Sequence, residues 1–395
     1  MTPAAGRIHS LDAVRALAMM LGIFLHTALP YTLPGFPWPV FDQSRSLALT
    51  VVLFVIHAFR MPAFFLVAGF FGRILHDRLG LRAFVRHRAR RILLPLIAFW
   101  ILLFPLIRFA WAWSYVHAVS GARPVGFAQA FAYAFDRHLL PAALGFAHLW
   151  FLYYLLIVYA AFLLFRAFVL RFSDSDRTLR AKIDAQIRSL VGSPMELPAL
   201  VVPTALLLVP MRSWGIDSPD ASLIPQLRSV LLYTAFFSYG WLLARQPALI
   251  DSYRLRWRRY PIIAAVALVP QLALLYLVTR AGVVAPPWLR IVFFANYALV
   301  GWSLTLAMLA LSARFFAEPN RFVRYAADAS YWMYLVHLPL VLLVGFGLAQ
   351  LALPWPVELG LAHLLVLPAL LLSYHLLVRS TWVGVLLNGR RQPRP

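Results

Sequence analysis

Three polar side chains stand inside the first long apolar run of the sequence, LDAVRALAMMLGIFLHTALPY at residues 11–31. They are Asp12, Arg15 and His26. Arg15 and His26 are eleven positions apart, which is about three turns of an α-helix, so they share one face and lie roughly 16 Å apart along the axis. Charged and titratable groups are costly in lipid and usually face the interior of a helix bundle, where they serve function. The pattern indicates a functional site on this helix.

An ion pair between Asp12 and Arg15 would neutralise one end of that helix, but it would not explain His26. A histidine that titrates near neutral pH among apolar groups is suited to act as a general base toward a hydroxyl. We therefore predict that Arg15 and His26 act together, with Asp12 in support.

Two further groups of cations accompany the next apolar runs. His57 and Arg60 are three positions apart and share a helix face, directly before Pro62, which weakens the local helix. Arg88 and Arg91, in RARRILLP, have the same spacing where the chain re-enters the membrane. Guanidinium groups match phosphate oxygens in pairs, so Arg88 and Arg91 suit a phosphate-bearing ligand. The alternative for Arg88 and Arg91 is a simple topology signal of positive charge at the cytoplasmic face.

Later polar groups have two open interpretations. His148 begins the run HLWFLYYLL, where it is either part of the site or part of an interfacial aromatic belt. Tyr334 and His337 lie along one side of SYWMYLVHLPL, where a single histidine often serves helix packing. We list His57, His148, Tyr334 and His337 as supporting candidates. The sequence has no acidic cluster that would predict a metal site.

Composition places the chain in a membrane. Of 395 residues, 62% are hydrophobic and 13% charged, and the mean hydropathy is +0.77. Long apolar runs without alternation predict an all-α polytopic protein in contact with membrane lipids, not a barrel. The net charge of +22 does not indicate nucleic acid, because the arginines cluster in alternate loops. Without cysteine, an acyl-cysteine intermediate is excluded.

We predict about ten transmembrane helices in a single bundle formed by one domain over residues 1–395. With both termini in the cytoplasm, the inner segments carry 25 Lys and Arg residues and the outer segments carry 6, as the positive-inside rule expects. The inner segment 171–196 predicts a short amphipathic surface helix. The outer segment 114–146 is a candidate either for a lid over an acceptor site or for part of an acceptor groove. The predicted spans are 11–32, 47–72, 92–113, 147–170, 197–211, 227–244, 261–279, 289–313, 326–348 and 357–378.

A histidine base, arginines for a polyanion and no phosphate-binding glycine loop suit acyl transfer from a coenzyme A thioester to a hydroxyl. The same residues would suit a transporter or flippase for an anionic solute nearly as well. Many transporters have repeated halves, and this sequence shows no internal repeat.

Five motifs, in order, resemble the membrane-bound acyltransferase family three over nearly the whole chain. They are the arginine–ten residues–histidine motif of Arg15 and His26, the run IHAFRMPAFFLVAGFF, the arginine–two residues–arginine motif of Arg88 and Arg91, and the runs HLWFL and SYWMYLVHLPL. Within the family, the chain looks most like members that succinylate periplasmic glucans.

The resemblance implies an O-acyltransferase of the bacterial inner membrane, without a permanently bound cofactor. It implies acyl-coenzyme A, with succinyl-coenzyme A favoured, as the cytoplasmic donor and a carbohydrate acceptor on the periplasmic side. Acetyl transfer to another cell-envelope glycan is the alternative. By resemblance His26 is the catalytic base, Arg15 its partner, and Arg88 and Arg91 bind the phosphates of the coenzyme. Arg60 is our candidate for a cation that meets the free carboxylate of a succinyl donor.

Overall fold

The computed structural model describes residues 8–34, 38–40, 42–120, 126–136, 145–171, 176–219, 222–280 and 286–389. Within these ranges the structure is helical, with no strand and one isolated bridge between Thr32 and Ser46, which confirms the all-α class. The helices and helical turns are α1 (His9–Ala28), η1 (Leu29–Tyr31), α2 (Leu47–Arg88), η2 (Ala89–Leu93), α3 (Leu94–Ser120), α4 (Phe127–Ala134), η3 (Ala147–Leu149), α6 (Trp150–Arg171), α7 (Asp176–Leu190), α8 (Glu196–Leu208), α9 (Leu227–Leu243), α10 (Leu249–Leu255), α11 (Arg259–Arg280), α12 (Pro287–Phe315), α13 (Arg321–Leu348), α14 (Trp355–Ser373), η4 (Tyr374–Val378) and α15 (Trp382–Asn388).

Seven helical stretches of the described chain are long and apolar enough to cross a membrane. One of them, Leu47–Val116, contains two of the predicted spans, 47–72 and 92–113. Helix α8 has 13 residues and α9 has 17, fewer than the roughly 20 that an upright span needs. The chain is thus a multi-pass membrane protein, whereas the total of ten spans stays a prediction.

The cytoplasmic location of both termini also stays a prediction. It rests partly on arginines that lie outside the described residues, namely Arg7, Arg123, Arg137, Arg390, Arg391 and Arg394.

The basic segment 73–91, predicted as a loop, is helical. Helix α2 continues through it to Arg88, because its Leu, Ala and Arg residues favour helix, and only Gly80 interrupts the helix with φ 73° and ψ 167°. The π-helical turn η2 then joins α2 to α3. Arg88 and Arg91 are therefore held on helical backbone, in the part of α2 that follows the Gly80 kink and in η2.

The two segments outside the predicted spans contain helices. Helix α7 lies in 171–196, as predicted, and its Asp184 accepts two hydrogen bonds from the Arg245 guanidinium at 2.5 and 2.7 Å, which lower the pKa of Asp184. The candidate lid 114–146 contains α4, whose Ala134 carbonyl accepts a hydrogen bond from Arg108. Residues 121–125 and 137–144 of that segment lie outside the described residues.

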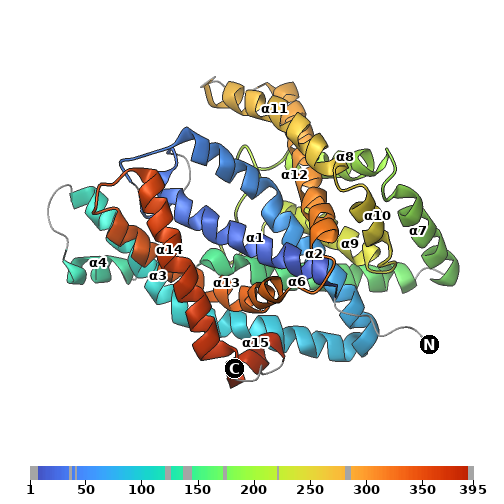
Figure 1. Ribbon diagram of the computed structural model, residues 1–395, viewed down its shortest axis with the longest axis horizontal. Coiled ribbons are helices and arrows are strands. Elements are labelled where there is room, and N and C mark those ends of the chain that lie inside the picture. The colour runs from blue at the N-terminus through green and yellow to red at the C-terminus, as the bar shows by residue number, and fades with distance from the viewer. Residues whose placement is uncertain are drawn as a thin grey trace.

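Helices α1 and α12 are central and α11 is peripheral. In α1 and in α12, 67% of the apolar window is buried, compared with 22% in α11. Figure 1 shows α1 crossing the middle of the molecule beside α2 and α13, while α11 projects from the rest at the end of α12. Groups on α1 are therefore screened from lipid by other helices.

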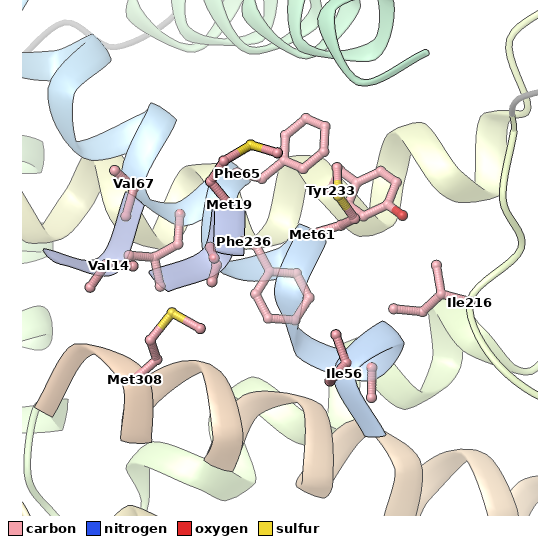
Figure 2. Packing of buried hydrophobic residues seen from close by; sticks show 14 of the residues in the cluster. Val14, Met19, Ile56, Met61, Phe65, Val67, Ile216, Tyr233, Phe236 and Met308 are labelled. Atoms are coloured by element: carbon pink, nitrogen blue, oxygen red, sulfur yellow. The ribbon is translucent and has the colours of Figure 1, made fainter. Parts of the chain in front are cut away.

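The core joins α1, α2, α9 and α12. Figure 2 shows Met19, Phe65, Tyr233 and Met308 among the buried side chains that these helices contribute. The rings of Phe65 and Tyr233 stack with centroids 4.3 Å apart. Helices α2 and α9 meet backbone to backbone at Gly69 and Gly240, where a Cβ would collide with the carbonyl of the facing helix. This close contact fixes the position of α2 beside α9.

Candidate active site

A cavity of about 1520 Å³ runs through the bundle, with walls from α1, α2, α6, α11 and α13. Helix α2 lines it with a continuous stripe from Leu47 to Phe71. These residues are 24 positions apart, so at 1.5 Å per residue the stripe is about 36 Å long. That length exceeds the roughly 30 Å thickness of a bilayer's hydrocarbon core. The cavity is therefore long enough to connect the two sides of a membrane.

The two ends of the cavity carry different groups. At the end that we call the Arg88 end, His87, Arg88 and Arg91 line the wall beyond Phe71 in the chain. At the other, the Asp217 end, the connection 209–226 meets α2, where the Ile216 carbonyl lies 2.9 Å from His57 Nε2. Leu33 and Thr50 line the same end and are joined by a hydrogen bond of 2.9 Å.

His26 and His337 form a hydrogen-bonded pair between α1 and α13. His26 Nδ1 lies 2.8 Å from His337 Nε2, and His337 Nδ1 lies 2.8 Å from the Tyr334 carbonyl and 3.1 Å from the Met333 carbonyl. A carbonyl only accepts, so we assign the proton of neutral His337 to Nδ1. Its Nε2 then accepts a hydrogen bond from His26 Nδ1. In the neutral pair His26 Nε2 carries the lone pair, so His26 presents a proton acceptor on a ring that lines the cavity.

Aromatic rings hold His26 in this orientation. The ring of His26 stacks with that of His337 at a centroid distance of 5.0 Å and an interplanar angle of 12°. It also stacks with the ring of Trp38, at 5.6 Å and 10°. His148 meets His337 edge to face at 5.1 Å and donates through Nε2 to the Leu335 carbonyl. Tyr334 donates to the His148 carbonyl at 2.7 Å. Two predicted supporting residues, His148 and Tyr334, thus fix the helix that carries His337.

Arg15 lies about three turns before His26 on α1. Its guanidinium is 3.5 Å from the Asp12 carboxylate, and Nη2 donates to the Ala327 carbonyl and to Ser330 Oγ at 3.2 and 3.4 Å. Asp12 is buried and is the one predicted site residue that does not line the cavity. The hydrogen bonds of Arg15 connect α1 to the start of α13, and the Arg15 side chain also lines the cavity.

Arg88 and Arg91 are positioned by contacts that leave part of each cation in the cavity wall. The Arg88 guanidinium lies over the rings of Phe84 and Tyr159 at 5.2 and 5.3 Å. Arg91 Nη1 donates to the Leu387 carbonyl at 3.0 Å, which connects η2 to α15. Neighbouring Arg90 is exposed and does not line the cavity. Arg88 and Arg91, which were predicted to share one helix face, therefore line the same end of the cavity.

Arg60 and His57 lie between the two ends. His57 donates to the Ile216 carbonyl. The Arg60 guanidinium lies against Gly22 of α1, where even a Cβ would collide with its Nη1. Gly22 lies one turn from His26 on the same helix, so Arg60 is placed next to the base in the middle of the cavity.

Sequence reasoning did not find the Asp217 end. Asp217 accepts hydrogen bonds from the backbone of Arg212 and Ser213 at 2.9 Å each and pairs with Arg228 at 2.8 Å. Burial would raise the pKa of Asp217, but these hydrogen bonds and the Arg228 charge hold it below its usual value. The resulting turn places Arg212, Ser213 and Ser218 at the wall. Its polar residues have no helical spacing that could have identified them.

Two cavity residues are not among the candidates that the sequence offers. Trp38 stacks on His26, and His87 lines the Arg88 end. By contrast, nine of the ten predicted site residues line this one cavity: Arg15, His26, His57, Arg60, Arg88, Arg91, His148, Tyr334 and His337.

Comparison with known proteins agrees with the motifs. A family model described as an acyltransferase domain matches residues 8–375. Glucans biosynthesis protein C of Escherichia coli, from strains SMS-3-5 / SECEC and SE11, is 27% identical over 344 residues, which cover 86% of this chain and 84% of the relative. No solved structure matches. Because the family match covers nearly all of the helical bundle and every residue that lines its cavity except Leu387, this membrane protein belongs to the acyltransferase 3 family.

Proposed function

We propose that this protein is a transmembrane O-acyltransferase that takes an acyl group from coenzyme A at the Arg88 end of the cavity. It delivers that group to a glycan hydroxyl that enters from the Asp217 end. In this proposal the Arg88 end faces the cytoplasm of a bacterial inner membrane. The acyl group crosses by covalent transfer, and coenzyme A stays on the side from which it came.

One observation carries the proposal: a single cavity contains both the Arg88–Arg91 pair and His26. The arginines can bind the phosphates of coenzyme A, because paired guanidinium groups match phosphate oxygens. From there the pantetheine arm would extend along α2 toward His26. A cavity without a base would favour transport, whereas the proton acceptor at its centre favours a reaction.

The reaction needs one base and proceeds directly between the two substrates. His26 Nε2 takes the proton of the acceptor hydroxyl as its oxygen attacks the thioester carbon. The new C–O bond forms, the C–S bond breaks, and His26 returns the proton to the sulfur of coenzyme A. His337 stabilises the imidazolium by accepting from Nδ1, as a partner of a catalytic histidine does. The products are an ester and free coenzyme A.

The identities of the acceptor and of the acyl group are proposed from sequence similarity to other proteins. The curated relatives are named for glucan biosynthesis, which supports a glucan as acceptor. The motifs resemble those of members that succinylate such glucans, which supports succinyl-coenzyme A as the donor. Acetyl transfer to another envelope glycan is the competing assignment.

The test is thiol release by the purified protein in detergent. Succinyl-coenzyme A and a periplasmic-type glucan should together release free coenzyme A at a rate that depends on the glucan. His26→Ala should bind coenzyme A as tightly as the wild type and release no thiol above background. Normal turnover in His26→Ala would overturn the proposal. Failure of the wild type to consume any thioester, combined with uptake of an intact anion by vesicles, would support transport instead.

A further inference from the structure

Arg60 is an unpaired cation in the middle of the cavity. Among the described residues, no hydrogen bond or ion pair to its guanidinium is present, and its Nε is buried without a partner. Three other cavity arginines differ: Arg15 pairs with Asp12, Arg91 donates to Leu387, and Arg228 pairs with Asp217. The Nε of Arg88 is also buried without a hydrogen-bond partner, but its guanidinium lies over the rings of Phe84 and Tyr159 at the end of the cavity proposed for the phosphates. A guanidinium without a counter-charge in an apolar bundle is costly unless a negative charge arrives during function.

The position of Arg60 identifies where that negative charge would lie. Its guanidinium touches Gly22, which is one helical turn closer to Arg15 than His26 is. Four residues at 1.5 Å per residue give about 6 Å along the axis. Arg15 donates to Ser330, and the next residue of α13, Tyr331, donates to the Arg91 carbonyl at 2.6 Å, so the Arg15 side of α1 is the Arg88 side of the cavity. Arg60 therefore lies on the Arg88 side of the base, at the level where the thioester of a donor bound to Arg88 and Arg91 would meet an acceptor hydroxyl on His26.

We propose that Arg60 is a catalytic residue that binds the oxyanion formed from the thioester carbonyl oxygen. This inference rests on the proposed function and adds to it the group that stabilises the transition state. In each turnover His26 holds the hydroxyl proton while the carbonyl oxygen becomes negative next to Arg60. When the C–S bond breaks, the oxygen becomes a carbonyl again and the thiolate takes the proton from His26. No charge or proton is left over.

The geometry favours the oxyanion over the free carboxylate of a succinyl donor, the role expected for Arg60 from the sequence. The carboxylate is the end of the acyl group farthest from coenzyme A. With the thioester carbon at His26, an extended succinyl group would point toward the Asp217 end, away from Gly22. Arg60 would meet the carboxylate only if the acyl group folded back on itself.

Two donors distinguish these roles. For Arg60→Gln, we expect kcat to fall about 10²- to 10³-fold with both succinyl- and acetyl-coenzyme A, which is the typical loss when one oxyanion donor is removed. KM for each donor should change little. A loss confined to succinyl-coenzyme A, seen as a rise in KM, would overturn the oxyanion role and assign Arg60 to the carboxylate. An unchanged kcat with both donors would overturn both roles.

Gly22→Ala tests the placement without removing the charge. The new methyl group would displace Nη1, which is the end of a flexible side chain, so the helix can form. We expect kcat to fall at least tenfold in Gly22→Ala, and to fall little further when the change is added to Arg60→Gln, because glutamine lacks the terminal nitrogen that the new methyl group would displace. Independent, additive effects of the two changes would contradict the contact. Gly360→Ala in α14 is the matched control, since its Cβ meets nothing within 4 Å, and it should retain full activity.

These experiments separate the two proposals. If the wild type transfers acyl groups and Arg60→Gln does so equally well, the oxyanion assignment fails and the proposed function stands. If the wild type transfers none with any donor, the proposed function itself fails. Coenzyme A binding, measured for each variant, shows that the bundle is intact and should equal that of the wild type.

Discussion

His26 donates through Nδ1 to His337 Nε2 over 2.8 Å, and His337 in turn donates to carbonyls of its own helix. The chain of donors ends at backbone oxygens, so its direction is fixed by groups that cannot reverse. It leaves Nε2 of His26, on a ring that lines the cavity, as the acceptor. His337, for which the sequence also allowed a purely packing role, thus sets the tautomer of the proposed base, His26.

We predict that His337 acts as a positioning residue whose loss lowers kcat. His337→Phe keeps a ring but removes the acceptor, so His26 can turn or change tautomer. We expect kcat to fall about 10²- to 10⁴-fold, the usual range for general-base catalysis. Steady-state kinetics with saturating donor and acceptor measure this loss.

The conservative variant separates positioning from packing. In His337→Gln, the amide oxygen can occupy the place of Nε2 and accept from His26. It should recover a substantial part of the activity that His337→Phe lacks, with coenzyme A binding equal in both. If the two variants were equally inactive yet bound coenzyme A normally, the hydrogen bond would not be what matters.

We predict that substitutions at the Arg88 end weaken binding of the acyl donor but leave the rate of the chemical step nearly unchanged. Arg88→Ala and Arg91→Ala each remove a charged contact worth about 1.5 to 3 kcal/mol, so KM for the acyl donor should rise about tenfold to a hundredfold. The value of kcat should stay within a few fold, because neither residue is near His26. Arg90→Ala is the matched control, because Arg90 is exposed, outside the cavity and equally charged. An equal rise in KM for Arg90→Ala would mean that only the net charge of the segment counts.

Asp217 is predicted to stabilise the fold in a pH-dependent way. Asp217→Asn removes the ion pair with Arg228 and weakens the hydrogen bonds from Arg212 and Ser213. We expect a loss of about 1 to 3 kcal/mol, seen as a lower thermal midpoint in detergent at neutral pH. Asp251→Asn is the control, because its pair with Arg254 is exposed and should contribute little.

The sign of the pH effect follows from the lowered pKa of Asp217. A carboxylate whose pKa is lower in the folded state stabilises fully above its unfolded pKa, about 3.9. That contribution is lost as the pH falls through the folded pKa. The difference between the wild type and Asp217→Asn should therefore be constant from neutral pH to about pH 5 and shrink at lower pH. A difference that grew on acidification would contradict this assignment.

The sequence predicted the elements of the site that helical spacing can encode. Arg15 and His26 on one face of α1, and Arg88 with Arg91, follow from the periodicity of a helix. Spacing could not reveal that His26 meets His337, because they are 311 residues apart in the chain. Nor could it place Trp38 on His26 or form the Asp217 turn, since these depend on where connections fold back over the bundle.

The extent of the helices was also underestimated from the sequence. Charge in 73–91 suggested a loop, because arginines are expected outside the membrane. The same arginines are good helix formers, and α2 continues to Arg88. Charge alone therefore did not predict the secondary structure of this segment.

The central claim is that an acyl group crosses the membrane while its carrier does not. The most direct measurement uses sealed proteoliposomes with glucan inside and succinyl-coenzyme A outside, the donor being labelled separately on its succinyl group and on its nucleotide. The account predicts that succinyl label accumulates on the enclosed glucan as an ester while all nucleotide label stays outside, and that His26→Ala abolishes the transfer. Nucleotide label inside the vesicles, or esterified glucan formed equally by His26→Ala, would contradict it.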